Sequence, residues 1–217
     1  GSTRAGREVA ARCGERLIGC SLELGGKNAM IVREDAPIAK AAEIAQRACF
    51  ANAGQLCISM ERIYVHEAVA DEFTAAFVAR VNAMRMAAEV GLSADMGSLT
   101  FARQLDRTLA HVADAVSKGA VVLAGGNPRP EIGPFFMEPT VLTGVTEDMD
   151  MCADETFGPL VAIYRVASDE EAVARANDTE YGLNAAVLTG DLAAGQAIAS
   201  RLRSGTVNIN EGYGPSW

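Results

Sequence analysis

Residues 184–210 read NAAVLTGDLAAGQAIASRLRSGTVNIN and combine three segments of different pattern. The first and the last, 184–190 and 206–210, are short and apolar and contain β-branched residues, which predicts two strands. The middle segment, 191–203, is long enough for a helix and ends close to Gly205. A strand, a helix and a second strand in this order predict neighbouring parallel strands in an α/β fold.

The same alternation extends along the rest of the chain, without an internal repeat or a low-complexity segment. Helical patterns cover 3–14, 37–53, 68–85, 101–118 and 169–177. Strand patterns cover 17–26, 29–33, 62–67, 120–126 and 160–166, and a further apolar stretch lies at 135–145. We therefore predict an α/β protein with a mostly parallel sheet flanked by helices.

The composition is that of a folded globular protein. Of its residues, 49% are hydrophobic and 22% are charged. A length of 217 residues is enough for one large domain, or for a domain with part of another. The formal net charge of −9 leaves no basic stripe, so we expect no nucleic-acid partner. No apolar run is long enough to cross a bilayer and no signal peptide is recognisable, so we expect a cytoplasmic protein with no membrane partner.

The number and spacing of the cysteines do not indicate a disulfide framework or a zinc site. There are five of them, an odd number, without a CxxC pair and with only two histidines to join them as ligands. We expect neither disulfides nor a metal site. By default each cysteine is a small buried core residue: Cys13, Cys20, Cys49, Cys57 and Cys152.

Cys57 departs from that default because of the loop around it. Residues 51–59 read ANAGQLCIS, in which a long helical pattern runs into Gly54 and the cysteine follows before a strand. Free backbone NH groups in such a loop favour a thiolate, and its small residues let a substrate approach the backbone closely. The pattern indicates a nucleophile.

A carboxylate that could act as a general base lies in LELGGKN, residues 22–28. Glu23 sits inside an apolar pattern and is followed by a pair of glycines. We expect it to be partly desolvated, which raises a carboxyl pKa toward the range of a general base. The alternative is a solvent-facing residue of an alternating strand.

Two further stretches suggest a ligand site. In DETFGPLVAIYRV, residues 154–166, Gly158-Pro159 breaks the chain before a strand and places Glu155 and Phe157 at its mouth, although an ordinary acidic turn is the alternative. GSTRAG, residues 1–6, is a helix start whose NH groups suit a phosphate. A plain N-cap at Ser2 or Thr3 would explain it equally.

Six motifs together resemble the aldehyde dehydrogenase superfamily. They are GSTRAG (1–6), LELGGKN (22–28), GQLC (54–57), ETFGP (155–159), YGLNAAVLTGD (181–191) and GTVNIN (205–210). Their order and spacing are similar to the family's over essentially the whole chain. The resemblance implies the catalytic-domain fold of that family, with a remnant of its Rossmann-like cofactor domain.

The resemblance also implies the chemistry. Cys57 would attack an aldehyde, the thiohemiacetal would pass hydride to the cofactor, NAD or NADP, and water activated by Glu23 would hydrolyse the thioester. The Cys57 NH and an asparagine outside this sequence would meet the oxyanion. The cofactor would meet five residues: Ser2 at the pyrophosphate, Glu155 at the nicotinamide ribose, and Leu24, Gly25 and Phe157 beside the nicotinamide.

Compared with the family, the sequence looks like part of a longer chain. We expect residues 1–24 to be the end of the NAD(P)-binding domain and 25–217 to be the catalytic domain, without the oligomerisation strand that follows in relatives. Because most of the cofactor site would lie elsewhere, we expect these residues alone to be inactive. The full-length enzyme is expected to be a homo-oligomer acting on a small aldehyde.

CSLELGGKNAMIV (20–32) and VNINEGYG (207–214) look most like the succinate-semialdehyde dehydrogenase branch. Such a substrate needs an arginine or a hydroxyl at its distal carboxylate. Arg62, Ser59 and Ser216 are candidates, although we expect Arg62 simply to cap the strand that follows it.

Two other functions stay open. A CoA-acylating aldehyde dehydrogenase would pass the acyl group to a thiol and need no hydrolytic base, which Glu23 argues against. A non-catalytic relative would use the fold as a scaffold, which the pairing of Cys57 with Glu23 disfavours.

Overall fold

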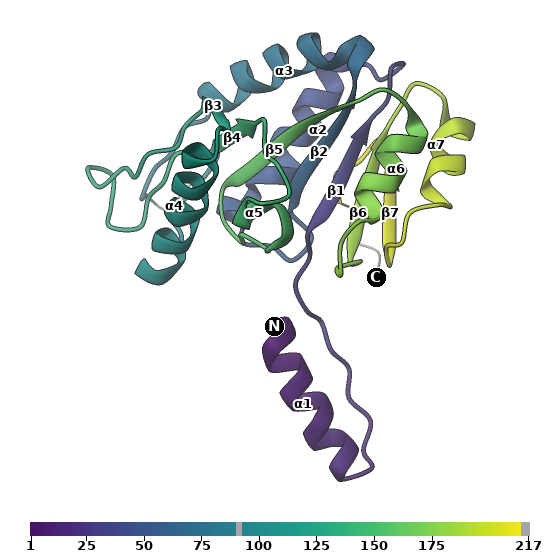
Figure 1. The fold of residues 1–217 in the computed structure, drawn as a ribbon. Helices are drawn as coiled ribbons and strands as arrows, with labels where there is room; N and C mark the ends of the chain where they lie inside the picture. The colour runs from purple at the N-terminus through teal and green to yellow at the C-terminus, as the bar shows by residue number, and fades with distance from the viewer. Residues whose placement is uncertain (90–92, 214–217) are drawn as a thin grey trace.

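The computed structural model describes residues 1–89 and 93–213, and its centre is a seven-stranded sheet (Figure 1). The strands lie in the order β3-β4-β5-β2-β1-β6-β7, and every neighbouring pair is parallel except β3 with β4. Their bounds are β1 Asn28–Val32, β2 Met60–His66, β3 Val121–Ala124, β4 Thr140–Thr143, β5 Leu160–Val166, β6 Asn184–Leu188 and β7 Thr206–Ile209. The predicted α/β fold with a mostly parallel sheet is confirmed.

Helices cover both faces of this sheet. Helices α2 and α3 pack against each other and against β2, while α6 packs on β1 and β2 from the opposite face (Figure 1). The central strands are buried on both faces, as expected for a parallel sheet covered by helices. The helices in this part of the fold are α2 Ile38–Phe50, α3 Glu67–Asn82, α4 Ala102–Ser117, α5 Asp150–Ala153, α6 Asp169–Asn177 and α7 Leu192–Ala199.

Four predicted helices are shorter in the structure, two of them clearly so, and the helix α5 was missed. The helix predicted over 37–53 stops at Phe50, because Asn52 and Ala53 take left-handed backbone angles. Helix α7 ends at Ala199 rather than at residue 203, in a turn that precedes β7. The one-turn helix α5 is too short to leave a periodic pattern in the sequence.

The N-terminal part stands away from the sheet. Helix α1, Thr3–Glu15, was predicted, and an extended segment leads from it back to β1 (Figure 1). The strand predicted over 17–26 is wrong, because no described strand runs beside this segment to pair with it. Leu17 and Ile18 are consequently 94% and 58% exposed. The domain boundary at 24/25 stays a prediction.

None of the helices in the described residues has the length and apolar character needed to cross a membrane.

Candidate active site

Two residues singled out in the sequence, Cys57 and Glu155, and two that were not, Asn28 and Asn184, lie at the amino-terminal ends of the parallel strands. Asn28 begins β1, Cys57 lies just before β2, Glu155 just before β5, and Asn184 begins β6. In most open α/β sheets ligands bind at the opposite, carboxyl ends. The loops that precede the strands therefore build this site.

The loop that carries Cys57 is fixed by an unusual backbone. Asn52, Ala53 and Gly54 have φ values of 53°, 54° and 70°, which turn the chain sharply after α2. The Gln55 side chain then fastens the loop to a distant segment, because its Oε1 accepts the Thr100 NH at 2.9 Å and the Thr100 hydroxyl at 2.8 Å. The position of the thiol is thus set by the turn and by this anchor.

Cys57 itself is half-buried, whereas Cys49 at the end of α2 is fully buried. Burial raises the pKa of the Cys49 thiol, which keeps it protonated and unreactive. The NH of Cys57 has no acceptor in the described part of the chain, while its carbonyl accepts the Asn28 side-chain NH at 2.8 Å. The loop therefore leaves one donor free beside the thiol.

Three asparagines hold the end of this loop against the sheet. Asn28 Nδ2 donates to the carbonyls of Cys57 and Ser59, and Asn28 Oδ1 accepts the Asn184 NH at 3.1 Å. Asn184 Nδ2 donates to the Ile58 carbonyl at 3.1 Å, and Asn208 donates to Asn184 Oδ1 at 3.0 Å. The side-chain amides of Asn28 and Asn184 thus pair the carbonyls of the Cys57 loop, and Asn208 orients Asn184.

Glu23 does not have the environment predicted for it. Its side chain is exposed, so the expected partial desolvation is wrong for this structure. The reason is the course of the backbone, since the segment from α1 to β1 runs outside the sheet and no described element covers it. Its carbonyl accepts a bond from the Gly1 amino group at 2.7 Å, which brings the start of α1 beside it.

The predicted cofactor residues at the start of α1 and around Leu24 are also close to one another. A Cβ added to Gly6 would lie 2.7 Å from the Leu24 side chain, so the first turn of α1 packs on Leu24. Ser2 acts as the N-cap of α1, because its hydroxyl accepts the Ala5 NH at 3.3 Å. This confirms the plain N-cap interpretation, and a contact with pyrophosphate stays a prediction.

Glu155 lies against the two glycines that follow Leu24. Its Oε1 accepts the Gly26 NH at 3.0 Å, and a side chain at Gly25 would collide with its carboxylate. Burial raises the pKa of Glu155, and the bond from Gly26 acts in the opposite direction. A Cβ on Gly26 would also lie 2.6 Å from the Cys57 carbonyl, so this glycine pair joins Glu155 to the Cys57 loop.

Helix α4 holds the backbone around Glu155 and Phe157. Gln104 Nε2 donates to the Thr156 carbonyl at 2.7 Å and to the Phe157 carbonyl at 2.9 Å, and Arg107 donates to the Glu155 carbonyl at 2.6 Å. Phe157 has a φ of 55°, which is uncommon for a bulky residue and shows that its neighbours impose the conformation. Glu155 is therefore part of a built loop and not of an ordinary acidic turn.

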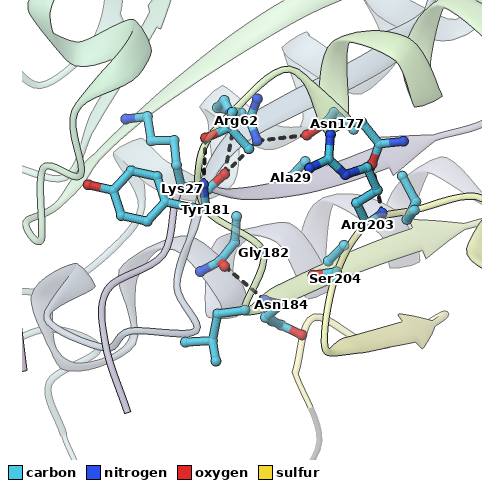
Figure 2. Close-up of a pocket in the computed structure, with 15 residues that line it drawn as sticks. Lys27, Ala29, Arg62, Asn177, Tyr181, Gly182, Asn184, Arg203 and Ser204 are labelled. Atoms are coloured by element: carbon cyan, nitrogen blue, oxygen red, sulfur yellow. Dashed lines mark hydrogen bonds between the residues drawn. The ribbon is translucent and has the colours of Figure 1, made fainter. Parts of the chain in front are cut away.

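Arg62 has a structural role, although not the expected cap of the strand that follows, because it lies inside β2 and bonds to other segments. It is buried, and its guanidinium donates to the carbonyls of Lys27, Arg175 and Ala176 and to the Tyr64 hydroxyl (Figure 2). These bonds occupy its donors, so none remains for a substrate carboxylate. It borders a pocket that Lys27, Tyr181 and Arg203 also line, and neither Cys57 nor Glu155 is among the lining residues (Figure 2).

Ser59 and Ser216 were the other two candidates for binding the distal carboxylate of the substrate. Ser59 is buried and its hydroxyl has no hydrogen-bond partner among the described residues. Ser216 lies outside the described residues.

The arrangement fits part of a dinucleotide site. The Glu155 carboxylate occupies the space that a side chain at Gly25 would fill, and the capped start of α1 packs on Leu24, the residue before this glycine. A helix start of this kind suits a phosphate. No group of three or more metal-ligating side chains occurs in residues 1–89 and 93–213.

The sequence profile that describes the aldehyde dehydrogenase family matches residues 1–216. The chain belongs to the aldehyde dehydrogenase family. A relative from Mycolicibacterium smegmatis, named "Putative succinate-semialdehyde dehydrogenase" with NADP(+), is 60% identical over 213 residues, which are 98% of this chain and 41% of the relative. "Aldehyde dehydrogenase, mitochondrial" from Leishmania tarentolae is 38% identical and matches 97% of this chain and 42% of that protein. The chain thus spans about two fifths of the length of these relatives.

Solved aldehyde dehydrogenases have the same fold. The betaine aldehyde dehydrogenase of Staphylococcus aureus in complex with NAD+ superposes with a TM-score of 0.94 at 30% identity, covering all of this chain and 43% of that one. The NAD+ complex of the Bacillus cereus aldehyde dehydrogenase has a TM-score of 0.92 at 36% identity, covering 97% of this chain and 43% of that one.

In this aldehyde dehydrogenase chain, contacts join Glu155 to Gly25 and, through Gly26, to the Cys57 loop, whereas the side chain of Glu23 is exposed. Sequence reasoning missed the residues that support them: Asn28, Gln55, Glu61, Gln104 and Asn184. One signal was present for Glu61, which with Arg62 places two charged residues at the start of a strand that continues with apolar residues.

Proposed function

We propose that the complete enzyme containing this chain oxidises an aldehyde to the carboxylic acid, with Cys57 as the nucleophile and NAD or NADP as the oxidant. One observation carries the proposal. The half-buried Cys57 thiol lies next to a backbone NH without an acceptor among the described residues, and Gly26 contacts both the Cys57 carbonyl and the Glu155 carboxylate. Family membership supports the reaction class.

In the proposed reaction the Cys57 thiolate forms a bond to the carbonyl carbon of the aldehyde. The negative charge moves to the carbonyl oxygen, where the free NH of Cys57 stabilises it. NAD(P)+ held by Gly25, Glu155 and Phe157 would supply the acceptor for the hydride that this carbon loses as its carbonyl re-forms. Cys57 then carries a thioester, a good acyl donor because the thiolate is a good leaving group.

Glu23 is proposed to activate the water that releases the acid. Its carboxylate would take a proton as the water oxygen attacks the thioester, and the Cys57 thiolate would leave. The exposed position of Glu23 gives it access to water. Its contact with Gly1 through the backbone keeps it near the start of α1.

For the cofactor we propose contacts of Ser2 with the pyrophosphate, of Glu155 with the nicotinamide ribose, and of Leu24, Gly25 and Phe157 with the nicotinamide. The close approach of the half-buried Glu155 carboxylate to Gly25 supports this assignment. The name of the M. smegmatis relative favours NADP, whereas the solved relatives cited above are NAD+ complexes.

We propose succinate semialdehyde as the substrate, because relatives that are 56–60% identical bear that name. Since the bonds of Arg62 are all used, another part of the complete enzyme is expected to bind the distal carboxylate. The inactivity of the isolated chain, a cytoplasmic location and a homo-oligomeric enzyme stay predictions.

The test follows NAD(P)H formation by the complete enzyme with a panel of aldehydes and each cofactor. We expect Cys57→Ser to abolish turnover, and Cys152→Ser, at a half-buried cysteine on α5, to leave it unchanged. Glu23→Gln should give one burst of NAD(P)H and then stall at the thioester. Full turnover of Cys57→Ser would refute the nucleophile, and turnover that requires added coenzyme A would indicate the acylating reaction instead. The isolated chain, assayed in parallel, should be inactive.

A further inference from the structure

A buried ion pair lies behind the candidate active site. Lys27 and Glu61 are 1% and 3% exposed, and Lys27 Nζ lies 2.5 Å from Glu61 Oε2. Lys27 follows the glycine pair, and Glu61 lies four residues after Cys57 in β2. Burying such a pair is costly, and it is weak evidence for stability by itself.

The carboxylate of Glu61 has a second set of partners in the loop that carries Glu155. The NH of Thr156 donates to both of its oxygens, at 2.9 and 3.0 Å, and the NH of Phe157 donates to Oε1 at 2.9 Å. A carboxylate that accepts bonds from backbone NH groups and an ammonium is in a strong charge-assisted arrangement. Glu61 thus holds two consecutive residues of this loop from inside the protein.

These bonds fix the two groups proposed to meet the nicotinamide end of the cofactor. Phe157 has the uncommon φ of 55°, which persists only where its neighbours impose it, and the bond from its NH to Glu61 is one such restraint. The backbone of Glu155 is held through the next residue, Thr156. Its carboxylate is held by a hydrogen bond from the NH of Gly26, which precedes Lys27. The pair therefore connects both backbone segments that orient the Glu155 carboxylate.

We propose that Glu61, held by Lys27, is a positioning residue for dinucleotide binding, which sets Glu155 and Phe157 in the geometry that receives the nicotinamide riboside. This inference rests on the proposed function, because it assumes that Glu155 and Phe157 meet the cofactor. The Cys57 loop is held separately, by Asn28 and Gln55, so the thiol does not depend on Glu61.

The experiment uses the complete enzyme and two variants. Glu61→Asp keeps the charge that Lys27 needs but withdraws the carboxylate by one methylene from the two NH groups. Lys27→Met/Glu61→Gln removes both charges together, so no unpaired charge is buried, and it remains informative should Glu61→Asp not fold. Asp169→Asn is the matched control, because it removes an ion pair with Arg33 at the opposite end of β1.

Three readouts separate positioning from stability. Calorimetric titration with NADP+ and NAD+ should show binding weakened on the order of 10- to 100-fold in Glu61→Asp, the range that misplaced binding groups produce. Amide hydrogen exchange at Thr156 and Phe157, without dinucleotide, should be faster. The rate at which iodoacetamide alkylates Cys57 should stay within about twofold of the wild type, and Asp169→Asn should change only the melting temperature.

The outcomes are distinct. If either folded variant binds dinucleotide as tightly as the wild type, Glu61 is only structural and the inference is overturned. If binding and Cys57 alkylation fall together, the variant has disturbed the whole site and positioning is also rejected. Activity that persists in Cys57→Ser would reject the proposed function. The dinucleotide binding measured for the Glu61 variants does not depend on that outcome and would still test the positioning role.

Discussion

Gly54 and Gly158 are in direct backbone contact, which joins the loop of Cys57 to the loop of Glu155. A Cβ on Gly54 would collide with the Gly158 carbonyl group, and Gly54 also has a φ of 70°. Space and backbone angle both require glycine at this position. The proposed nucleophile and the proposed cofactor carboxylate are therefore fixed relative to each other by a contact between two glycines.

Gly54→Ala adds only one methyl group, but we expect it to displace the Cys57 loop from the Glu155 loop. A left-handed alanine costs about 1–2 kcal/mol, and relief of the collision would move one loop away from the other. We expect slower alkylation of Cys57 by iodoacetamide and a lower free energy of unfolding. Gly97→Ala is the control, because a Cβ there meets nothing within 4 Å and should have no effect. Wild-type alkylation in Gly54→Ala would show that the contact does not position the thiol.

The cysteines should differ in reactivity in the folded chain. Cys49 should resist iodoacetamide, because burial raises the pKa of its thiol, and Cys13 should react slowly because desolvation and the neighbouring Cys20 raise the pKa of its thiol. Cys57 should react first, since it is accessible beside a free NH. Peptide mapping after alkylation at several pH values measures the order. A Cys57 no faster than Cys13 or Cys49 would contradict its assignment as the nucleophile.

The fold was largely predictable because its elements leave local patterns. The strand–helix–strand unit over 184–210 has the predicted order and a parallel pairing of β6 with β7. The strand predicted at 17–26 failed for a physical reason: an apolar pattern shows that a segment can pair, but pairing needs a neighbouring strand. Leu17 and Ile18 have none in the described structure and are exposed.

The site was predictable where a residue type carries the chemistry, and not where it supports another residue. Cys57 and Glu155 stand in short motifs that the sequence alone singles out as candidates. Asn28 and Glu61 act through backbone groups of segments that are distant in the sequence, and only the fold shows which carbonyl or NH group lies opposite them. Supporting residues of this kind have no local signature.

Asn28→Ala tests the support of the Cys57 loop. It would leave the carbonyls of Cys57 and Ser59 and the NH of Asn184 without their partner. Because a buried polar group that loses its bond costs about 1–3 kcal/mol, we expect a loss of unfolding free energy on that order in urea titrations, together with altered alkylation of Cys57. Asn82→Ala, at an exposed position at the end of α3, should be neutral, and equal stability of the two variants would contradict the role of Asn28.

His111 on α4 should make the stability of the chain depend on pH. Its Nδ1 lies 3.1 Å from the Thr156 hydroxyl, and burial, together with the positive charges of Arg107 and Lys27, lowers its pKa. In the unfolded chain the imidazole titrates near its ordinary pKa of about 6.5. Between the lowered pKa and that value the unfolded state binds more protons, so the unfolding free energy should fall as the pH falls through this window.

His111→Gln, which keeps a polar group that can reach Thr156 but cannot titrate, should flatten that dependence. The comparison is urea unfolding of the two proteins at several pH values between 8 and 5. Above the ordinary pKa of histidine the two curves should run parallel, and below it the wild type should lose stability faster. Parallel curves over the whole range would mean that His111 is protonated equally in the folded and unfolded states, and the environment described for it would then be wrong.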